Sequence, residues 1–173
     1  MKILVNLIES WRIKRVLKNV KGKLLDVGCG NNRLVKKYGN GIGVDVYPWD
    51  GIDLLINDSS SLPFNDNEFD TITIVAALNH IPNRITCLKE VNRVLSNDGK
   101  IVITMITPRI SKIWHRIIYR WDSDQHERGM TEGEVWGFTV EQIHKLLELS
   151  GFQVIKHEHF MFYLNHIYIG KKR

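Results

Sequence analysis

The sequence contains few of the residues that define several classes of protein. Its 173 residues include only two cysteines, Cys29 and Cys87, too few for a disulfide framework. The longest apolar run, around residues 72–78, is far shorter than a bilayer-spanning helix requires. The N-terminal stretch is amphipathic, and basic residues follow it without a small-residue cleavage site, so no secretory signal is predicted. We therefore expect a cytoplasmic protein without a transmembrane segment.

The overall composition is typical of a soluble globular chain. Apolar residues make up 43% of the sequence and charged residues 25%. A chain of this length can bury a core of ordinary size, which predicts a single domain over residues 1–173. The formal net charge of +5 permits a phosphate-bearing or membrane-surface partner but does not require one.

One stretch, residues 24–32, organises the rest of the chain. It begins with an apolar pair that predicts a buried strand, and Asp26 lies near the end of that strand. Gly28 and Gly30 then bracket a tight turn, after which an apolar pattern predicts a helix. Because glycine lacks a Cβ, the backbone can bend sharply there and a ligand can approach it closely. The start of the helix would direct its unpaired N–H groups to the same place.

Two acidic residues end the strands that follow. Residues 41–45 read as a second strand that ends in Asp45, at about the separation, roughly 20 residues, at which a carboxylate reaches a ribose hydroxyl pair. A third strand, predicted at residues 52–57, precedes Asp58. Only residues 47–51 separate the two strands, and they include a proline and a glycine, so we expect a loop there rather than a helix.

Strands and helices alternate along the chain. The other predicted elements are strands at 69–76, 100–105, 152–159 and 163–170, helices at 2–19, 32–38, 84–95, 109–121 and 139–149, and a turn at 97–99. This alternation predicts an α/β fold with a Rossmann-like, doubly wound sheet of seven mostly parallel strands. The sheet is expected to end in a C-terminal antiparallel hairpin and to be abbreviated between strands 2 and 3. Residues 1–20 form a helical cap in this interpretation.

Five motifs, in this order, resemble the class I S-adenosylmethionine-dependent methyltransferases, in particular the small type-11 group. The motifs are DVGCGNN, GVDV, NDSSSLPF, NDNEFDTITIVAALNHIP and EVNRVLSNDGKIVIT. The resemblance is dense over residues 21–107 and looser elsewhere. It implies an enzyme that moves a methyl group from S-adenosylmethionine to an acceptor by in-line displacement. We expect the acceptor to be a small or lipid-linked molecule.

The resemblance also implies a cofactor site. Asp45 would accept hydrogen bonds from the ribose hydroxyls, Asp58 would accept one from the adenine amino group, and Asp26 would attract the methionine ammonium group. Gly28 and Gly30 would let the methionine part lie against the backbone. The remaining residues implied at the cofactor are Val46, Ser59 and Ala76.

Two positions distinguish this chain from related patterns. Asn32 stands where the family commonly has a third glycine, and asparagine tolerates a left-handed backbone better than most residues. Arg33 stands where a nicotinamide-binding GxGxxG turn needs its last glycine. Asp26 would also repel a pyrophosphate, which argues further against a nicotinamide-dependent enzyme.

Two histidines are candidate general bases for a hydroxyl acceptor. His80 follows the central strand, and an unperturbed imidazole titrates near neutrality, as a base for this reaction requires. A structural hydrogen bond at the strand end is the alternative role for His80. His126, in the long polar loop, is a weaker second candidate.

No metal centre is predicted from the sequence. Asp122 and Asp124 lie near His126, but nothing completes a ligand set there. His157 and His159 would share one face of a strand, where we expect them to be exposed decoration.

Residues 109–137 follow the fifth strand and are predicted to cover the active site on the acceptor side. Their first part is an amphipathic helix with one apolar and one basic stripe, and a long glycine-punctuated polar loop follows. A helix packed permanently on the sheet is the alternative. Two other functions remain open: an RNA methyltransferase whose basic residues bind phosphates, and a catalytically silent cofactor-binding module that acts through a protein partner. The basic residues concerned are Lys14, Arg15, Lys18, Arg116 and Arg120.

Overall fold

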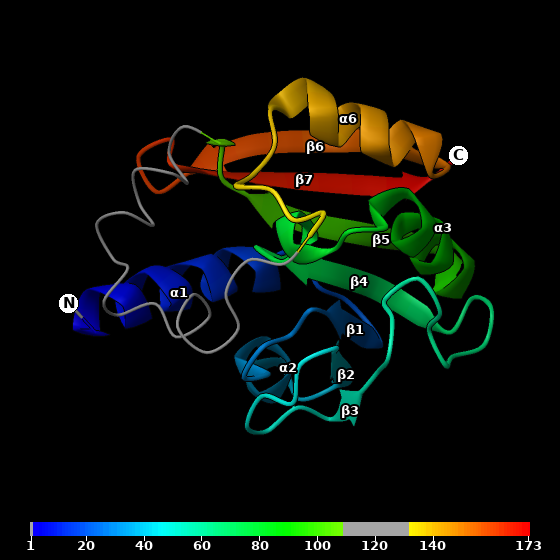
Figure 1. The fold of residues 1–173 in the computed structure, drawn as a ribbon, viewed down its shortest axis with the longest axis horizontal. Coiled ribbons are helices and arrows are strands. Elements are labelled where there is room, and N and C mark those ends of the chain that lie inside the picture. Colours follow the sequence, from blue (N-terminus) through cyan, green and yellow to red (C-terminus); the bar gives the residue numbers. More distant parts are fainter. Residues whose placement is uncertain (1, 109–131) are drawn as a thin grey trace.

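The computed structural model describes residues 2–108 and 132–173 (Figure 1). Its helices are α1 (Lys2–Leu17), α2 (Arg33–Tyr38), the short 3₁₀ helix η1 (Leu78–His80), α3 (Arg84–Val94) and α6 (Val140–Leu149). Its strands are β1 (Leu24–Val27), β2 (Gly41–Asp45), β3 (Leu54–Leu55), β4 (Phe69–Val75), β5 (Leu95–Met105), β6 (Phe152–Phe160) and β7 (Asn165–Lys172). None of the helices within these described ranges is long and apolar enough to cross a bilayer.

The strands form one seven-stranded sheet in the order β3-β2-β1-β4-β5-β7-β6. The first five strands in this order run parallel to one another, whereas β7 is antiparallel to both β5 and β6. The predicted α/β fold, with its C-terminal antiparallel hairpin, is therefore confirmed. In a parallel sheet the carboxyl ends of the strands lie at one edge, so the turns after β1, β2 and β4 meet there.

Alternate residues of the central strands face opposite layers of helix. Ile101 and Ile103 of β5 pack in the cluster that contains α3 and α6, whereas Val102 between them packs with α1 and α2. This alternation is the pattern of a strand that is buried on both faces. Figure 1 shows α6 lying along β6 and β7, and α1 on the other side of the sheet. The helix predicted at the N-terminus is thus packed on the sheet through Ile13 and Val16.

The link between β2 and β3 is a loop, as the sequence predicts. The third strand is shorter than expected, because only Leu54 and Leu55 pair with β2. Both leucines are exposed, since none of the helices in the described part of the chain covers this edge of the sheet. The predicted turn at residues 97–99 is instead part of β5, in a stretch where the pairing of β5 with β4 is irregular.

The C-terminal helix begins at a capping box. The backbone N–H of Gln142 donates to Thr139 Oγ1 at 3.3 Å, and the Thr139 N–H donates to Gln142 Oε1 at 2.8 Å. This reciprocal pair satisfies two N–H groups that the helix itself leaves unpaired. The helix predicted at 109–121 lies outside the described residues.

Candidate active site

The glycine turn after β1 has the strained backbone that only glycine adopts easily. Gly28 and Gly30 have φ angles of 72° and 52°. A Cβ on Gly28 would lie 2.5 Å from the Cβ of Ala77, so the turn packs directly against the end of β4. A Cβ on Gly30 would meet no described atom within 4 Å. The backbone of Gly30 is therefore accessible to a ligand, as the sequence analysis requires.

Asp45, at the end of β2, is bonded directly to this turn. One carboxylate oxygen accepts the N–H of Gly30 at 2.9 Å, and the other accepts the N–H of Tyr47 at 3.0 Å. Asp45 is buried, so these bonds fix its orientation. The acid predicted at the ribose and the glycine turn predicted at the methionine part are therefore in contact across two neighbouring strands.

Asn32 supports the turn in place of the family's third glycine. Its φ angle of 58° is left-handed, as expected for an asparagine that replaces glycine. Its side-chain amide donates to the carbonyl of Gly51 at 3.2 Å, which ties the turn to the loop between β2 and β3. A Cβ on Gly43 would lie 2.0 Å from Asn32 Oδ1, so a glycine in β2 makes room for this side chain.

Asp26 is an acid in an almost fully buried position. It is 2% exposed, and Thr73 Oγ1 donates to its Oδ1 at 2.5 Å. Burial raises the pKa of Asp26 to about 7, although the bond from Thr73 opposes this shift. Burial and the nearby carboxylates, Asp26 first, also raise the pKa of Cys29 far above its usual value. Cys29 is therefore a thiol at neutral pH, which agrees with a packing role.

The other implied cofactor residues lie at the same edge of the sheet but differ in setting. Asp58 is exposed and accepts bonds from the N–H and Oγ of Ser60 at 2.9 and 2.5 Å, which lower its pKa. Ser59 is buried, whereas Val46 is exposed. Ala76, directly after β4, has a φ angle of 54°, a strained conformation for alanine that is common at functional sites. None of the described hydrogen bonds joins Asp58 to the glycine turn.

His80, in η1, is paired with an acid that the sequence analysis did not connect with it. Its Nδ1 lies 2.8 Å from Oε2 of Glu134, whose side chain is fully buried. In the tautomer that donates the Nδ1 proton to Glu134, Nε2 is the unprotonated nitrogen of the ring. This is the arrangement in which a carboxylate orients a histidine for general-base chemistry. His126, the second candidate base, lies outside the described residues.

Three further bonds hold the segment around Glu134 against η1. Val135 N–H donates to the carbonyl of Asn79 at 3.0 Å, and Arg84 donates to the carbonyls of Gly133 and Asn79 at 2.6 and 3.2 Å. The described end of the predicted cover, residues 132–137, therefore lies directly beside the candidate base. Most of that cover, residues 109–131, lies outside the described residues.

Comparison with known proteins identifies this arrangement. Residues 25–103 match the family model described as "Methyltransferase domain", which spans β1 to β5 and the glycine turn. Residues 25–103 therefore carry a methyltransferase domain.

Curated relatives match the same part of the chain. A demethylmenaquinone methyltransferase of Staphylococcus saprophyticus is 39% identical over 117 residues, covering 54% of this chain and 50% of the relative. The enzyme of the same name from Staphylococcus carnosus is 36% identical over 117 residues, covering 54% of this chain and 48% of the relative. The chain thus spans about half the length of these curated relatives.

Solved structures share the fold over nearly the whole chain. A methyltransferase from Thermotoga maritima, titled a possible histamine N-methyltransferase, has a TM-score of 0.72 and 18% identity and covers 99% of this chain and 98% of its own. A protein from Pyrococcus horikoshii has a TM-score of 0.72 and 19% identity, covering 97% and 92%. The trans-methyltransferase CalH, solved in complex with SAH, has a TM-score of 0.63 and 16% identity, covering 87% and 51%.

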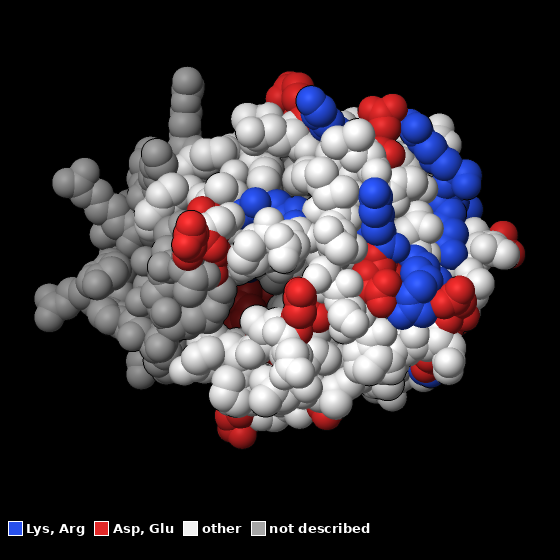
Figure 2. Space-filling model, turned by 45° about the vertical axis from the view of Figure 1, so that its right-hand side comes forward, with Lys and Arg blue, Asp and Glu red and all other residues white. Residues whose placement is uncertain are grey.

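Figure 2 shows a hollow in the surface of the chain in which acidic atoms lie recessed. Most lysine and arginine side chains in this view gather on the right-hand part of the face, and one blue group lies just above the hollow. A recessed acidic surface would attract a ligand that carries positive charge. The sulfonium and ammonium groups of S-adenosylmethionine have that charge.

Proposed function

We propose that the chain is a methyltransferase that uses S-adenosylmethionine to methylate a lipid-linked acceptor of the demethylmenaquinone type. The observation that carries the proposal is the contact between Asp45 and the Gly30 backbone at the carboxyl edge of the sheet. The sulfonium of S-adenosylmethionine supplies an activated methyl group when the cofactor is bound. The chain's part is then to hold the cofactor, align the acceptor and accept a proton.

The residues of the glycine turn fit this cofactor. Each carboxylate oxygen of Asp45 accepts one backbone N–H but has a second lone pair, with which it would accept a ribose hydroxyl. Asp26 would accept the ammonium group, and that positive charge would favour the ionised carboxyl. The accessible backbone of Gly30 would lie beside the methionine part. Asp58 would reach the adenine amino group while keeping its bonds to Ser60.

His80 is the base in this proposal. Glu134 holds its Nδ1 at 2.8 Å, so Nε2 would take the proton of a hydroxyl on the reduced, hydroquinone form of the acceptor. The deprotonated ring would then bond to the methyl carbon through the adjacent ring carbon as the methyl–sulfur bond breaks, with S-adenosylhomocysteine as the leaving group. The ring carbon would lose its own proton to solvent, and the imidazolium would return its proton to the ring oxygen. A buried carboxylate also stabilises the imidazolium that forms. The hydrogen bonds between η1 and residues 132–137 would keep the side chains of His80 and Glu134 in contact.

Exposed apolar side chains support a lipid-linked acceptor. The turn between β6 and β7 carries Phe162, Tyr163 and Leu164, which are 85%, 74% and 41% exposed. Trp11 of α1 packs edge-on against Phe162, with ring centroids 6.1 Å apart, and is itself exposed. Adjacent exposed aromatic and aliphatic side chains of this kind are typical of surfaces that contact a membrane or an apolar ligand. The relatives' named substrate is likewise attached to a lipid tail.

A transfer assay tests the proposal. The purified chain is incubated with methyl-labelled S-adenosylmethionine and with demethylmenaquinone that dithionite has reduced to its hydroquinone form, presented in detergent, and labelled product is extracted. We expect product from the natural chain and from Asp98→Ala, an exposed acid at the start of β5. We expect a loss of cofactor affinity in Asp45→Ala, measured by calorimetry. Cofactor binding without any product would be consistent with a methyltransferase but would reject this acceptor.

The two other functions predict different results in the same experiment. An RNA methyltransferase would label RNA and bind it with a steep salt dependence. Arg15, one of its proposed phosphate ligands, is already paired with Glu158 at 2.5 Å, which weakens this alternative. A silent module would bind the cofactor but transfer its methyl group to neither acceptor.

A further inference from the structure

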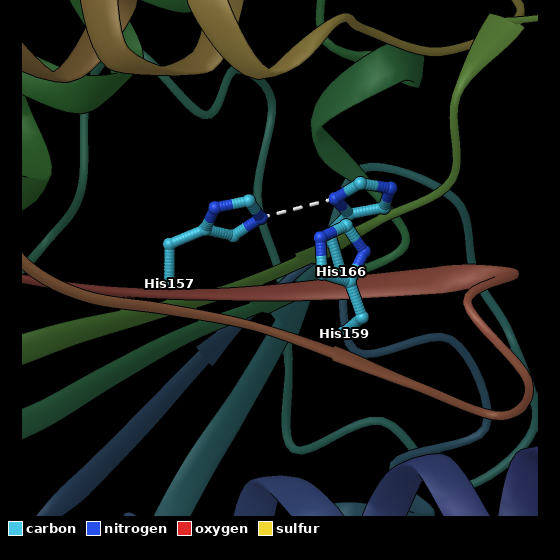
Figure 3. Close-up of side chains that lie close together, drawn as sticks. All are labelled: His157, His159 and His166. Atoms are coloured by element: carbon cyan, nitrogen blue, oxygen red, sulfur yellow. Dashed lines mark hydrogen bonds between the residues drawn. The ribbon is translucent and has the colours of Figure 1, made fainter.

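Three histidines meet at one end of the hairpin formed by β6 and β7 (Figure 3). His157 and His159 lie on β6, and His166 lies opposite them on β7, where it pairs with His159 in the strand register. The ligand atoms of the three residues all lie within 4.8 Å of one another. The sequence pattern predicts only that His157 and His159 share a strand face and are exposed. The prediction of exposure is correct for His159 but wrong for the half-buried His157.

We propose that His157, His159 and His166 bind a divalent transition-metal ion such as Zn²⁺. In a tetrahedral site with Zn–N bonds of about 2.0–2.1 Å, the nitrogens of two ligands lie about 3.3–3.4 Å apart. His157 Nε2 and His166 Nδ1 are 3.0 Å apart, close to that value. His159 is exposed, so a rotation of its ring can bring its nitrogen within bonding distance of an ion held by the other two histidines. The three imidazoles would leave a fourth position for water or another ligand.

The surroundings hold these rings in place. Tyr168 stacks on His157 with ring centroids 4.5 Å apart and an interplanar angle of 1°, and Tyr168 is fully buried. His166 is buried as well, so its ring has little freedom. The turn that joins the two strands contains three consecutive non-glycine residues with positive φ: Met161, Phe162 and Tyr163. Strain of this kind is found where a structure fixes side chains for a function.

The protonation state also suits a metal. Burial, followed by the neighbouring histidines, lowers the pKa of His166 to about 4, and the same causes lower the pKa of His157. Both rings are therefore neutral at pH 7, and the neutral imidazole is the form that binds metal ions. Imidazole nitrogens favour Zn²⁺, Cu²⁺ and Ni²⁺ over Mg²⁺ and Ca²⁺, which prefer oxygen ligands. The nearest acid in sequence, Glu158, is paired with Arg15 and Lys156 instead.

Calorimetric titration of tag-free protein with Zn²⁺ tests the proposal. We expect one Zn²⁺ per chain and no binding of Mg²⁺. The Zn²⁺ affinity of His159→Gln should fall by more than about 10- to 100-fold, which is the loss expected when only an outer-sphere partner of a ligand is removed. His159 is exposed, so its replacement should leave the fold intact. His144→Gln is the matched control, because His144 contacts His157 and Tyr168 without belonging to the ligand group.

Thermal unfolding gives a second readout that needs no acceptor. An ion that bridges β6 and β7 should raise the unfolding midpoint of the natural chain and of His144→Gln as the Zn²⁺ concentration increases, and should have no such effect on His159→Gln. His166→Gln should also lose binding, with circular dichroism used to check that the buried replacement still folds. Equal Zn²⁺ affinity in His159→Gln and His144→Gln, or no binding by the natural chain, would overturn the proposal.

Discussion

The buried carboxyl of Asp26 should make the chain less stable as the pH rises from about 4 to about 7. A rise in its pKa from 3.8 to about 7 corresponds to about 4 kcal/mol, at about 1.4 kcal/mol for each pH unit. Because the pKa is higher in the folded chain, Asp26 favours folding below about pH 4. This contribution is lost as the pH rises to about 7.

The variant Asp26→Asn isolates this effect. Asparagine keeps an oxygen that can accept the bond from Thr73, but it cannot ionise. Between pH 5 and pH 8 the natural chain should lose about 2–3 kcal/mol of unfolding free energy relative to the variant. Urea unfolding of both proteins at several pH values measures this difference. Histidines titrate in both proteins alike, so their contribution cancels.

Cofactor binding should change the favoured form of the Asp26 carboxyl from protonated to ionised. An ammonium group beside the carboxyl favours its ionised form, so binding at pH 6 should release a proton. Calorimetry in buffers with different ionisation enthalpies detects that proton, and Asp26→Asn should release none at this site. A difference in unfolding free energy that does not change with pH would refute the assignment of a raised pKa. Equal proton release by the two proteins would refute the contact with the ammonium group.

Four other results follow from the site. Asp45→Ala should weaken cofactor binding by about 1.5–3 kcal/mol, as for lost bonds to a charged group, with Asp98→Ala unchanged in calorimetry. His80→Ala should lower the single-turnover rate about 10²- to 10⁴-fold without changing cofactor affinity, and Glu134→Gln should lower it less; natural rates in His80→Ala would leave that residue a structural role. The rings of Tyr47 and Trp49, whose centroids lie 4.5 Å apart, are expected to cover the adenosine. Cofactor binding should therefore quench the tryptophan fluorescence of the natural chain, and this quenching should be smaller in a Tyr47→Ala, Trp49→Ala double variant. Phe162→Ser should reduce co-sedimentation with lipid vesicles, whereas the exposed control Ile155→Ser should not.

The parts of this site that the sequence predicts are those that local backbone geometry decides. Gly28, Gly30 and the left-handed Asn32 lie in one short turn, and Asp45 ends the next strand in the sheet. Parallel strands that follow one another through short connections become neighbours, so the meeting of these residues can be read from their order.

The parts that the sequence does not predict depend on contacts between distant segments. Glu134 reaches His80 across 54 positions, and nothing in a polar loop marks which of its acids will be buried. His166 joins His157 only through the register of β7 against β6. Around Leu54 and Leu55 the sequence predicts too much structure. The apolar run there predicts a full strand, but the loop between β2 and β3 provides no helix to cover such a strand, and only these two residues pair with β2.

The two edges of the sheet also bear on how the chain avoids pairing with copies of itself. The edge at β3 offers only two residues, too few to template another strand. The edge at β6 is nine residues long, but its pairing with β7 shifts between Val154 and Lys156. An irregularity at that point bends an edge strand, and the charged side chains of Lys156 and Glu158 follow it directly. Both edges therefore carry features that oppose edge-to-edge aggregation.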